Sequence, residues 1–249
     1  MSDGGRRDAD AADRSTAGDD EDAADRNDER AAPASDPRTA AVILAGGTSS
    51  RFGDDRADKA LADLCGVPMV DHVAARLAPV VDEVVVNCRP RQTDAIRRTV
   101  PGATLAVDPV PDRGPLYGIR TGLRATSADR VAVVACDLPL VDPTFVDALV
   151  GFLGGHDAAV PRREDGWFVP TLAAYRRGPA LEAADAALAA DDARPLAAVE
   201  RLSTRVVEEA EAMALTDEST FLDVNTEDDL AEAELLLRAD ERLVCDQSG

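Results

Sequence analysis

The chain has little positive charge and almost no lysine. Its 249 residues carry 48 acidic side chains against 27 basic ones, which gives a formal net charge of −21. Lys59 is the only lysine, so the other 26 basic residues are arginines. A protein this acidic repels polyanions, which excludes nucleic acid as a general partner. An acidic surface depleted of lysine is typical of a protein that stays soluble in a salty cytoplasm.

The sequence also lacks long hydrophobic runs and clusters of soft metal ligands. No apolar run approaches the roughly 20 residues that span a bilayer, and the N-terminus has no signal-peptide core, so we expect a cytoplasmic protein without a membrane partner. The four cysteines, Cys65, Cys88, Cys136 and Cys245, show no C-x-x-C spacing. This pattern predicts buried thiols in a reducing cytosol rather than disulfides or a zinc site.

The first 38 residues lack the apolar content that a core requires. They carry 12 acidic and 6 basic residues among alanine, serine and glycine, and they are predicted to form a disordered acidic tail. A docking arm is the alternative. Residues 39–240 are predicted to form one domain, which is long enough to bury a good-sized core, and 241–249 a short C-terminal tail.

Short β-branched runs alternate with helical patterns from residue 39 onward. Strands are expected at 39–45, 83–88, 104–107 and 130–136, followed by helices at 68–77, 93–99, 116–125 and 143–152. Because these strands are apolar on both faces and alternate with helices, they predict an α/β fold with a doubly wound, mostly parallel sheet and helices on both faces. The second half is less regular, with strands expected at 157–161, 167–175 and 204–208 and helices at 179–190 and 226–238.

The segment LAGGTSSRFG begins where the first expected strand ends. Gly46 and Gly47 allow the backbone to approach a ligand closely, and successive N–H groups of such a loop can bind an anion. Arg51 adds a guanidinium fork suited to phosphate oxygens. The loop matches neither the Walker nor the dinucleotide-binding glycine pattern. A plain turn is the alternative for the glycine pair alone.

Lys59 follows this loop. The sequence uses arginine at every other basic position, which suggests that Lys59 serves a purpose that arginine fulfils poorly. A compact ammonium on a flexible stem can follow a phosphate where a broad guanidinium does not fit. We therefore predict that Lys59 binds the phosphates of a nucleoside triphosphate. A leftover surface lysine is the alternative.

Asp137 follows the apolar run VAVVAC directly. Ligands of parallel sheets bind beyond the carboxyl ends of the strands, and Mg²⁺ prefers hard oxygen ligands with only one or two protein carboxylates. Asp137 is therefore predicted to bind Mg²⁺. A turn or helix-capping aspartate is the alternative.

The order of these segments resembles the molybdenum cofactor guanylyltransferase family of nucleotidyltransferases. The resemblance covers most of residues 40–238 and implies a Rossmann-like nucleotidyltransferase fold. It rests on LAGGTSSRFG…DKAL…GVPMVDHV, DRGPLYGIRTGL, VACDLPLVDPTFVDAL, VPTLAAY and FLDVNTEDDL. One departure is the stretch Asp54–Ala57, which is longer than the family's usual link.

Members of this family transfer GMP from GTP to molybdopterin and release pyrophosphate. The resemblance implies the same reaction here, with Mg²⁺ as cofactor and with GTP and a phosphorylated pterin acceptor as partners. It agrees with Asp137 as the metal ligand. It also implies nucleotide-binding roles at the strand ends, where the carboxylate of Asp108 can accept hydrogen bonds from guanine N1–H and N2–H₂. The predicted nucleotide-binding residues are Leu44, Ala45, Gly46, Gly47, Lys59, Asn87, Asp108 and Asp137, with Lys59 and Arg51 as the catalytic cations.

Some roles stay open at this level. Asn87 and Asp108 can also be ordinary strand-end turn residues. Gly114, Gly118 and Gly122 serve either a phosphate-facing helix start or close helix packing, and Asn225 serves either the metal or a helix N-cap. On the acceptor side, Arg162 and Arg163 with Trp167 and Tyr175 can meet a pterin and its phosphate, and packing is an equal explanation for the aromatics.

Two other functions compete with this one. The first is another nucleotidyltransferase of the same fold, acting on a cytidylyl-pterin, sugar-phosphate or corrinoid acceptor. The second is a non-catalytic nucleotide-binding protein, which would have lost the metal carboxylate that Asp137 supplies. We further expect a monomer that hands its product to molybdoenzymes or other cofactor-biosynthesis proteins.

Overall fold

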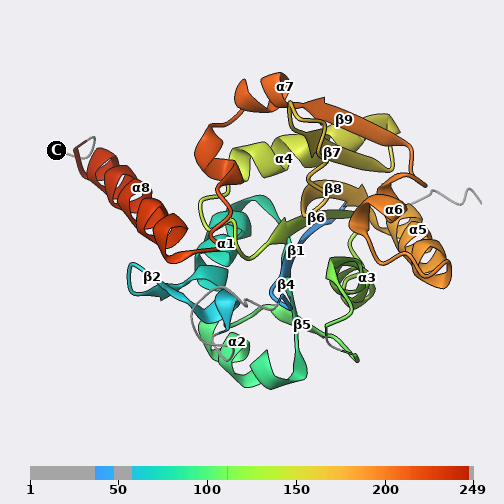
Figure 1. Ribbon diagram of the computed structural model, residues 1–249, viewed down its shortest axis with the longest axis horizontal. Helices are drawn as coiled ribbons and strands as arrows, with labels where there is room; N and C mark the ends of the chain where they lie inside the picture. Colours follow the sequence, from blue (N-terminus) through green and yellow to red (C-terminus); the bar gives the residue numbers. More distant parts are fainter. Residues whose placement is uncertain (1–36, 48–57, 111, 247–249) are drawn as a thin grey trace, which may run out of the picture. The chain divides into compact units, whose positions relative to one another are not determined.

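The computed structural model describes residues 37–47, 58–110 and 112–246, with side chains as far as residue 239 (Figure 1). Most of the predicted acidic tail, Arg51 and the stretch Asp54–Ala57 lie outside the described residues. No helix within the described ranges is long and apolar enough to cross a membrane.

A seven-stranded sheet forms the centre of the domain, with strand order β5-β4-β1-β6-β8-β7-β9. Neighbours among β5, β4, β1 and β6 are parallel, β8 is antiparallel to both β6 and β7, and β9 is parallel to β7. The predicted mostly parallel sheet is therefore confirmed. The strands are β1 (Thr39–Leu44), β4 (Glu83–Cys88), β5 (Thr104–Val107), β6 (Arg130–Ala135), β7 (Ala158–Arg162), β8 (Leu172–Arg176) and β9 (Thr204–Glu208).

Helices cover both faces of the sheet, because alternate residues of each strand point to opposite layers. In β1, Ala41 and Ile43 pack in the layer of α1 (Met69–Leu77), α2 (Thr93–Thr99), α4 (Pro143–Gly151) and α7 (Glu209–Met213). Val42 and Leu44 pack with α3 (Pro115–Ala125), α5 (Arg177–Ala189) and α6 (Pro195–Val199), which lie together on the other side in Figure 1. This two-sided burial is the reason why the strand sequences are apolar throughout.

The chain reverses its winding direction at β1. β4 and β5 lie on one side of β1, and β6 lies on the other. The register pairs Leu44 with both Asn87 and Ala135, so the carboxyl ends of the three strands are level. Open α/β sheets bind their ligands in the crevice at such a reversal.

Several elements differ from the prediction, and the short helices α6 and α7 were not predicted. The strand expected at 167–175 is reduced to β8, since Phe168 makes only an isolated bridge to Arg162 and Pro170 has no N–H to donate. A small hairpin of β2 (Asp63–Leu64) and β3 (Val67–Pro68) was not predicted.

The last helix, α8 (Glu227–Asp246), is longer than the 226–238 expected and runs past residue 240. It starts with a reciprocal cap. The Thr226 Oγ1 accepts from the Asp229 N–H at 3.1 Å, and Asp229 Oδ2 accepts from the Thr226 N–H at 2.8 Å.

The described cysteines differ in exposure. Cys88 and Cys136 are buried free thiols, as predicted, but Cys65 is exposed at the hairpin turn with φ 56°. Burial raises the pKa of the Cys88 thiol to about 11, and it raises the pKa of Cys136 as well. The exposed Cys65 corrects the prediction of buried thiols throughout.

The rate of thiol labelling should depend on the exposure of each cysteine. Because the thiolate is the reactive form, we expect an alkylating reagent at pH 8 to modify Cys65 in the folded protein and to leave Cys88 and Cys136 unmodified. Peptide mass mapping measures the labelling, and the denatured protein, in which all three should react, serves as the control. Native labelling of Cys136 at the rate of Cys65 would contradict the burial described here.

Candidate nucleotide site

A cavity of about 540 Å³ lies at the carboxyl ends of β1, β4, β5 and β6. This volume is within the usual range of small-molecule sites. Ala45 does not line the cavity; it is buried, and its carbonyl accepts a 2.8 Å hydrogen bond from Gln92 Nε2. The structure thus gathers the described predicted residues at one edge of the sheet. The lining includes Leu44, Gly46, Gly47, Lys59, Asn87, Asp108 and Asp137.

Lys59 links two distant segments at one end of this cavity. Its Nζ donates to Asp137 Oδ2 at 2.7 Å and to Asn225 Oδ1 at 2.6 Å. The lysine side chain is only 10% exposed, and the Asp137 side chain 26%. Lys59 starts a 3₁₀ turn (Lys59–Leu61), and the Val224 N–H donates to the Asp137 carbonyl at 2.9 Å. The ammonium is therefore held in the cavity and is not a free surface group.

Asn225 faces the site and does not cap α8. Its side-chain oxygen accepts from Lys59, while Thr226 and Asp229 cap the helix. Asp223 and Asn225 both line the cavity together with Asp137. Burial raises the pKa of the Asp223 carboxyl, and the charge of Asp137 raises it further.

These three side chains offer only oxygen ligands, from one amide and two carboxylates. Across the described ranges, no group of three or more histidine, cysteine, aspartate or glutamate residues could hold a metal ion alone. Mg²⁺ commonly takes one or two protein carboxylates and completes its shell with phosphate oxygens and water. The donor set therefore suits Mg²⁺ shared with a polyphosphate better than a resident structural metal.

A second polar pair, Asn87 and Asp108, lies on the cavity at the ends of β4 and β5. Asn87 Nδ2 donates to Asp108 Oδ1 at 2.9 Å and to the Ala106 carbonyl at 3.0 Å. Both residues are buried. A Cβ at Gly46 would lie 3.1 Å from Asp108 Oδ2 and 3.2 Å from Asn87 Oδ1. The two acceptor oxygens therefore lie against the backbone of Gly46, which has to lack a side chain.

Gln92 holds these segments together and was not found from the sequence. Its Nε2 donates to the Ala45 carbonyl at 2.8 Å and to Asp58 Oδ1 at 2.7 Å, and its Oε1 accepts from the Arg89 N–H at 2.6 Å. One buried amide thus joins the end of β1, the end of β4 and the residue before Lys59. A single glutamine at a helix start carries no sequence signal for such a role.

The glycines of α3 serve close packing. A Cβ at Gly118 would lie 2.5 Å from Asn87 Oδ1, and one at Gly122 would overlap Val42 Cγ1. Gly114, with φ 92°, lies at the helix start and lines the cavity. Of the two explanations left open for this segment, a position at the site therefore applies to Gly114. Close packing applies to Gly118 and Gly122, which let α3 approach the sheet.

Substitution of these glycines should have separable effects. Gly118→Ala should push Asn87 off its position and weaken GTP binding, by about tenfold if one hydrogen bond of about 1.5 kcal/mol is lost. Gly122→Ala is the matched control, because its overlap is with the core residue Val42. It should lower the free energy of unfolding by about 1–3 kcal/mol and leave GTP affinity unchanged. Calorimetric titration and chemical denaturation measure the two effects, and equal GTP affinity in both variants would contradict the assignment.

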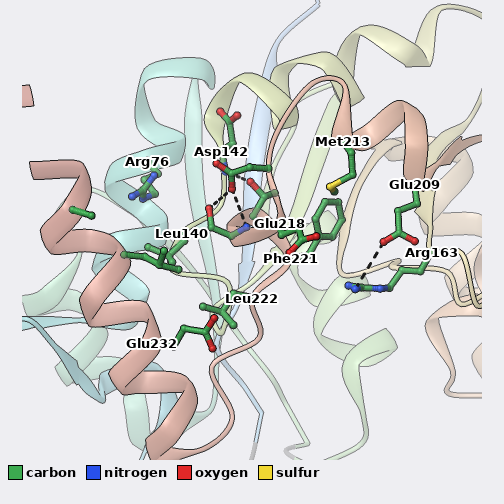
Figure 2. A pocket seen from close by; sticks show the side chains of 15 residues that line it. Arg76, Leu140, Asp142, Arg163, Glu209, Met213, Glu218, Phe221, Leu222 and Glu232 are labelled. Atoms are coloured by element: carbon green, nitrogen blue, oxygen red, sulfur yellow. Dashed lines mark hydrogen bonds and ion pairs between the residues drawn. The ribbon is translucent and has the colours of Figure 1, made fainter. Parts of the chain in front are cut away.

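A larger cavity of about 880 Å³ lies elsewhere, between α8 and the segment 217–222 (Figure 2). It contains none of the predicted nucleotide-binding or metal-binding residues, but Arg163, which was considered for the acceptor side, lines it. In Figure 2, Arg163 points toward Glu209 on one side, and Glu232 of α8 lies on the other. Five carboxylates line this cavity against the two arginines, Arg76 and Arg163, so it suits a polyphosphate less well than the smaller cavity does.

The residues considered for the acceptor side differ in their surroundings. Arg162 and Arg163 pair with Glu208 and Glu209, and Trp167 is largely exposed. Tyr175 is buried in the α3–α5 layer, and its hydroxyl donates to the Pro170 carbonyl at 2.8 Å. Of the two explanations left open for Tyr175, the structure supports packing, because alternation along β8 turns this ring into the core.

Comparison with known proteins agrees with this geometry. The model of the MobA-like NTP transferase domain matches residues 41–210. The chain is 44% identical to a probable molybdenum cofactor guanylyltransferase of Natronomonas pharaonis, over 77% of this chain and 95% of the relative. It is 37% identical to a protein with the same name from Haloferax mediterranei, over 78% and 92%.

A solved structure has the same fold. Molybdopterin-guanine dinucleotide biosynthesis protein A from Archaeoglobus fulgidus superposes with a TM-score of 0.68 at 25% identity, over 80% of this chain and 99% of that one. The predicted Rossmann-like nucleotidyltransferase fold is thus confirmed. With a family model matched over most of its length and a curated relative at 44% identity, the chain belongs to the MobA-like NTP transferases, the nucleotidyltransferase family of the molybdenum cofactor guanylyltransferases.

Proposed function

We propose that the protein transfers GMP from GTP to the terminal phosphate of molybdopterin and releases pyrophosphate. One observation carries the proposal. Lys59 Nζ and Asp137 Oδ2 meet at 2.7 Å in a cavity that also contains the Asn87–Asp108 pair. A cation suits the phosphates, and buried acceptor oxygens suit a base with donor groups. The names of the relatives identify the acceptor class.

The reaction is an in-line displacement at phosphorus. A phosphate oxygen of the acceptor attacks the α-phosphorus of GTP and forms the new P–O bond. The bond from the α-phosphorus to the oxygen bridging to the β-phosphate breaks, and pyrophosphate leaves with that electron pair. The acceptor is already an anion, so no general base is required. Catalysis consists of positioning and charge neutralisation.

Lys59 supplies the cation for the phosphate oxygens, and Arg51 is proposed as the second one. Asp137, Asp223 and Asn225 would hold Mg²⁺, which offsets charge on the phosphates when it is bound. The ammonium of Lys59 fixes the Asp137 carboxylate and the Asn225 amide relative to each other.

At the other end, Asp108 Oδ2 is proposed to accept from guanine N1–H and N2–H₂. Asn87 fixes this carboxylate through the hydrogen bond to Oδ1. Backbone groups of Leu44, Ala45, Gly46 and Gly47 complete the proposed nucleotide contacts. Adenine has no matching pair of donors, so the site favours guanine.

The remaining proposals concern the protein in the cell. We propose a cytoplasmic monomer that passes its product to molybdoenzymes or other cofactor-biosynthesis proteins, with residues 1–38 as a tail outside the catalytic domain. Size-exclusion chromatography with light scattering checks the monomer.

The experiment that tests the function measures pyrophosphate release. The full chain is incubated in high salt with Mg²⁺, GTP labelled at the α-phosphate, and molybdopterin or one of several other phosphorylated acceptors. We expect pyrophosphate release and labelled dinucleotide only with GTP and molybdopterin. Equal turnover with CTP would favour a cytidylyl acceptor, and GTP binding without any turnover would favour a nucleotide-binding protein without catalysis.

A further inference from the structure

Arg89 is a buried arginine with unsatisfied donors beside the nucleotide cavity. Its side chain is only 5% exposed, and its Nε and Nη2 groups have no hydrogen-bond partner among the residues that the structure describes. Burial of a charged guanidinium without hydrogen bonds is costly, and unsatisfied buried donors are rare in native proteins. The proposed transfer reaction uses neither group. Arg89 therefore needs another explanation.

Its nearest described ion-pair partner is a residue of the cavity wall. Asp112 Oδ1 lies 3.2 Å from Arg89 Nη2, outside hydrogen-bond geometry. The Asp112 side chain is 60% exposed, its backbone has φ 62°, and it lines the cavity. Water competes for an exposed carboxylate, so this pair is weak. Arg89 does not itself line the cavity, so its guanidinium reaches the cavity only when the exposed Asp112 side chain rotates away.

The backbone of Arg89 is fixed just beyond the end of β4. The chain stays extended at Arg89 (φ −80°, ψ 157°), two residues after Asn87, so both side chains point to the same side of the sheet. The Arg89 N–H donates to Gln92 Oε1, and Gln92 in turn donates to the Ala45 carbonyl. Arg89 therefore starts from a rigid position next to the Asn87–Asp108 pair.

We infer that Arg89 determines base specificity by donating to O6 and N7 of guanine. Nε and Nη2 of a guanidinium form two parallel donors, and O6 and N7 are the neighbouring acceptors that arginine binds in this bidentate way. Asp108 accepts from the adjacent N1–H and N2–H₂ edge. The base replaces the Asp112 carboxylate at Nη2. This inference rests on the proposed function, because it assumes that GTP occupies this cavity.

The two residues together select guanine from both edges. Adenine presents an amino donor in place of O6, and a guanidinium has no acceptor for it. Adenine also lacks the donor pair for Asp108. Arg89 therefore adds a second, independent barrier against ATP.

An analogue that lacks one acceptor tests this contact. 7-Deaza-GTP carries C–H in place of N7 and is otherwise GTP. By calorimetric titration with Mg²⁺, we expect the wild-type protein to bind it about tenfold more weakly than GTP, as the loss of one charge-assisted hydrogen bond predicts. Arg89→Met should bind GTP at least about tenfold more weakly than wild type and should bind both nucleotides equally.

The controls separate base reading from a structural role. Arg97→Met removes an exposed arginine and should keep the wild-type preference for GTP. Asp108→Asn should keep the preference for GTP over 7-deaza-GTP and lose the preference for GTP over inosine triphosphate, which has no N2 amine. Arg89→Lys, which keeps the charge without the fork, should lose the N7 preference even if Arg89→Met does not fold.

Two results would overturn the inference. One is equal binding of GTP and 7-deaza-GTP by the wild-type protein, which needs no variant at all. The other is a preserved N7 preference in Arg89→Met or Arg89→Lys. Either result leaves the proposed function intact, whereas a wild-type protein that binds no GTP contradicts the proposed function itself.

Discussion

Lys59→Ala should lower the rate of pyrophosphate release by about 10²–10³-fold. This is the usual loss when one preorganised donor to a developing oxyanion is removed, about 2.7–4 kcal/mol. The ammonium lies in the cavity, bonded to Asp137 and Asn225, and its side chain is largely buried. Alanine leaves the phosphates without this cation and the Asp137 carboxylate without its partner. Steady-state kinetics with saturating Mg²⁺ measure the effect.

Two further variants sharpen this result. Lys59→Arg keeps the charge but places a broad guanidinium where a compact ammonium fits between two oxygens 2.6–2.7 Å away, so it should also be strongly impaired. Arg97→Ala removes a cation that is 68% exposed on α2 and should leave the rate unchanged. Thermal melts establish that each variant is folded. Activity of Lys59→Ala within a few-fold of wild type would refute its role.

Asp137→Asn should cause a loss of similar size and a changed metal response. The substitution keeps the shape and an oxygen that can accept from Lys59, so the fold should survive. It removes the anionic oxygen that Mg²⁺ prefers. We expect a rate about 10²–10³-fold lower, since charge neutralisation at the phosphates is impaired. The concentration of Mg²⁺ needed for half-maximal rate should rise, as measured by titration of pyrophosphate release.

A matched carboxylate elsewhere provides the control. Asp142 caps α4, with Oδ1 accepting from the Thr144 N–H at 2.7 Å, and lines the larger cavity. Asp142→Asn should lower stability by at most about 1 kcal/mol and leave the Mg²⁺ response unchanged. If Asp137→Asn behaves like Asp142→Asn, the metal assignment is wrong.

The parallel half of the fold and the gathering of strand-end residues follow from local sequence. Apolar runs separated by helical patterns define β1, β4, β5 and β6, and parallel strands bring their carboxyl ends to one edge. Asn87, Asp108 and Asp137 each follow or end such a strand, so their proximity could be predicted without knowledge of any long-range contact.

Other features of the site depend on long-range contacts, which cannot be recognised from the local sequence. The Lys59–Asn225 hydrogen bond joins residues 166 positions apart. From the sequence alone, a helix N-cap explained Asn225 as well as a role at the metal did. The inward orientation of Tyr175 depends on where β8 begins, and Pro170 obscured that boundary. Arg89 looked like any other arginine after a strand, because burial, and not composition, makes it unusual.

The antiparallel direction of β8 decides which segment of the C-terminal half of the chain lies beside the nucleotide cavity. Because β8 runs opposite to β6, its first residue pairs with Val134, and the Thr171 carbonyl accepts from the Ala135 N–H at 2.8 Å. The connection that enters β8 therefore borders the cavity, while the far end of the strand leads away into α5. Thr171, at the end of this connection, lines the cavity, so a change of length before it can reshape that wall of the site without altering the strand order.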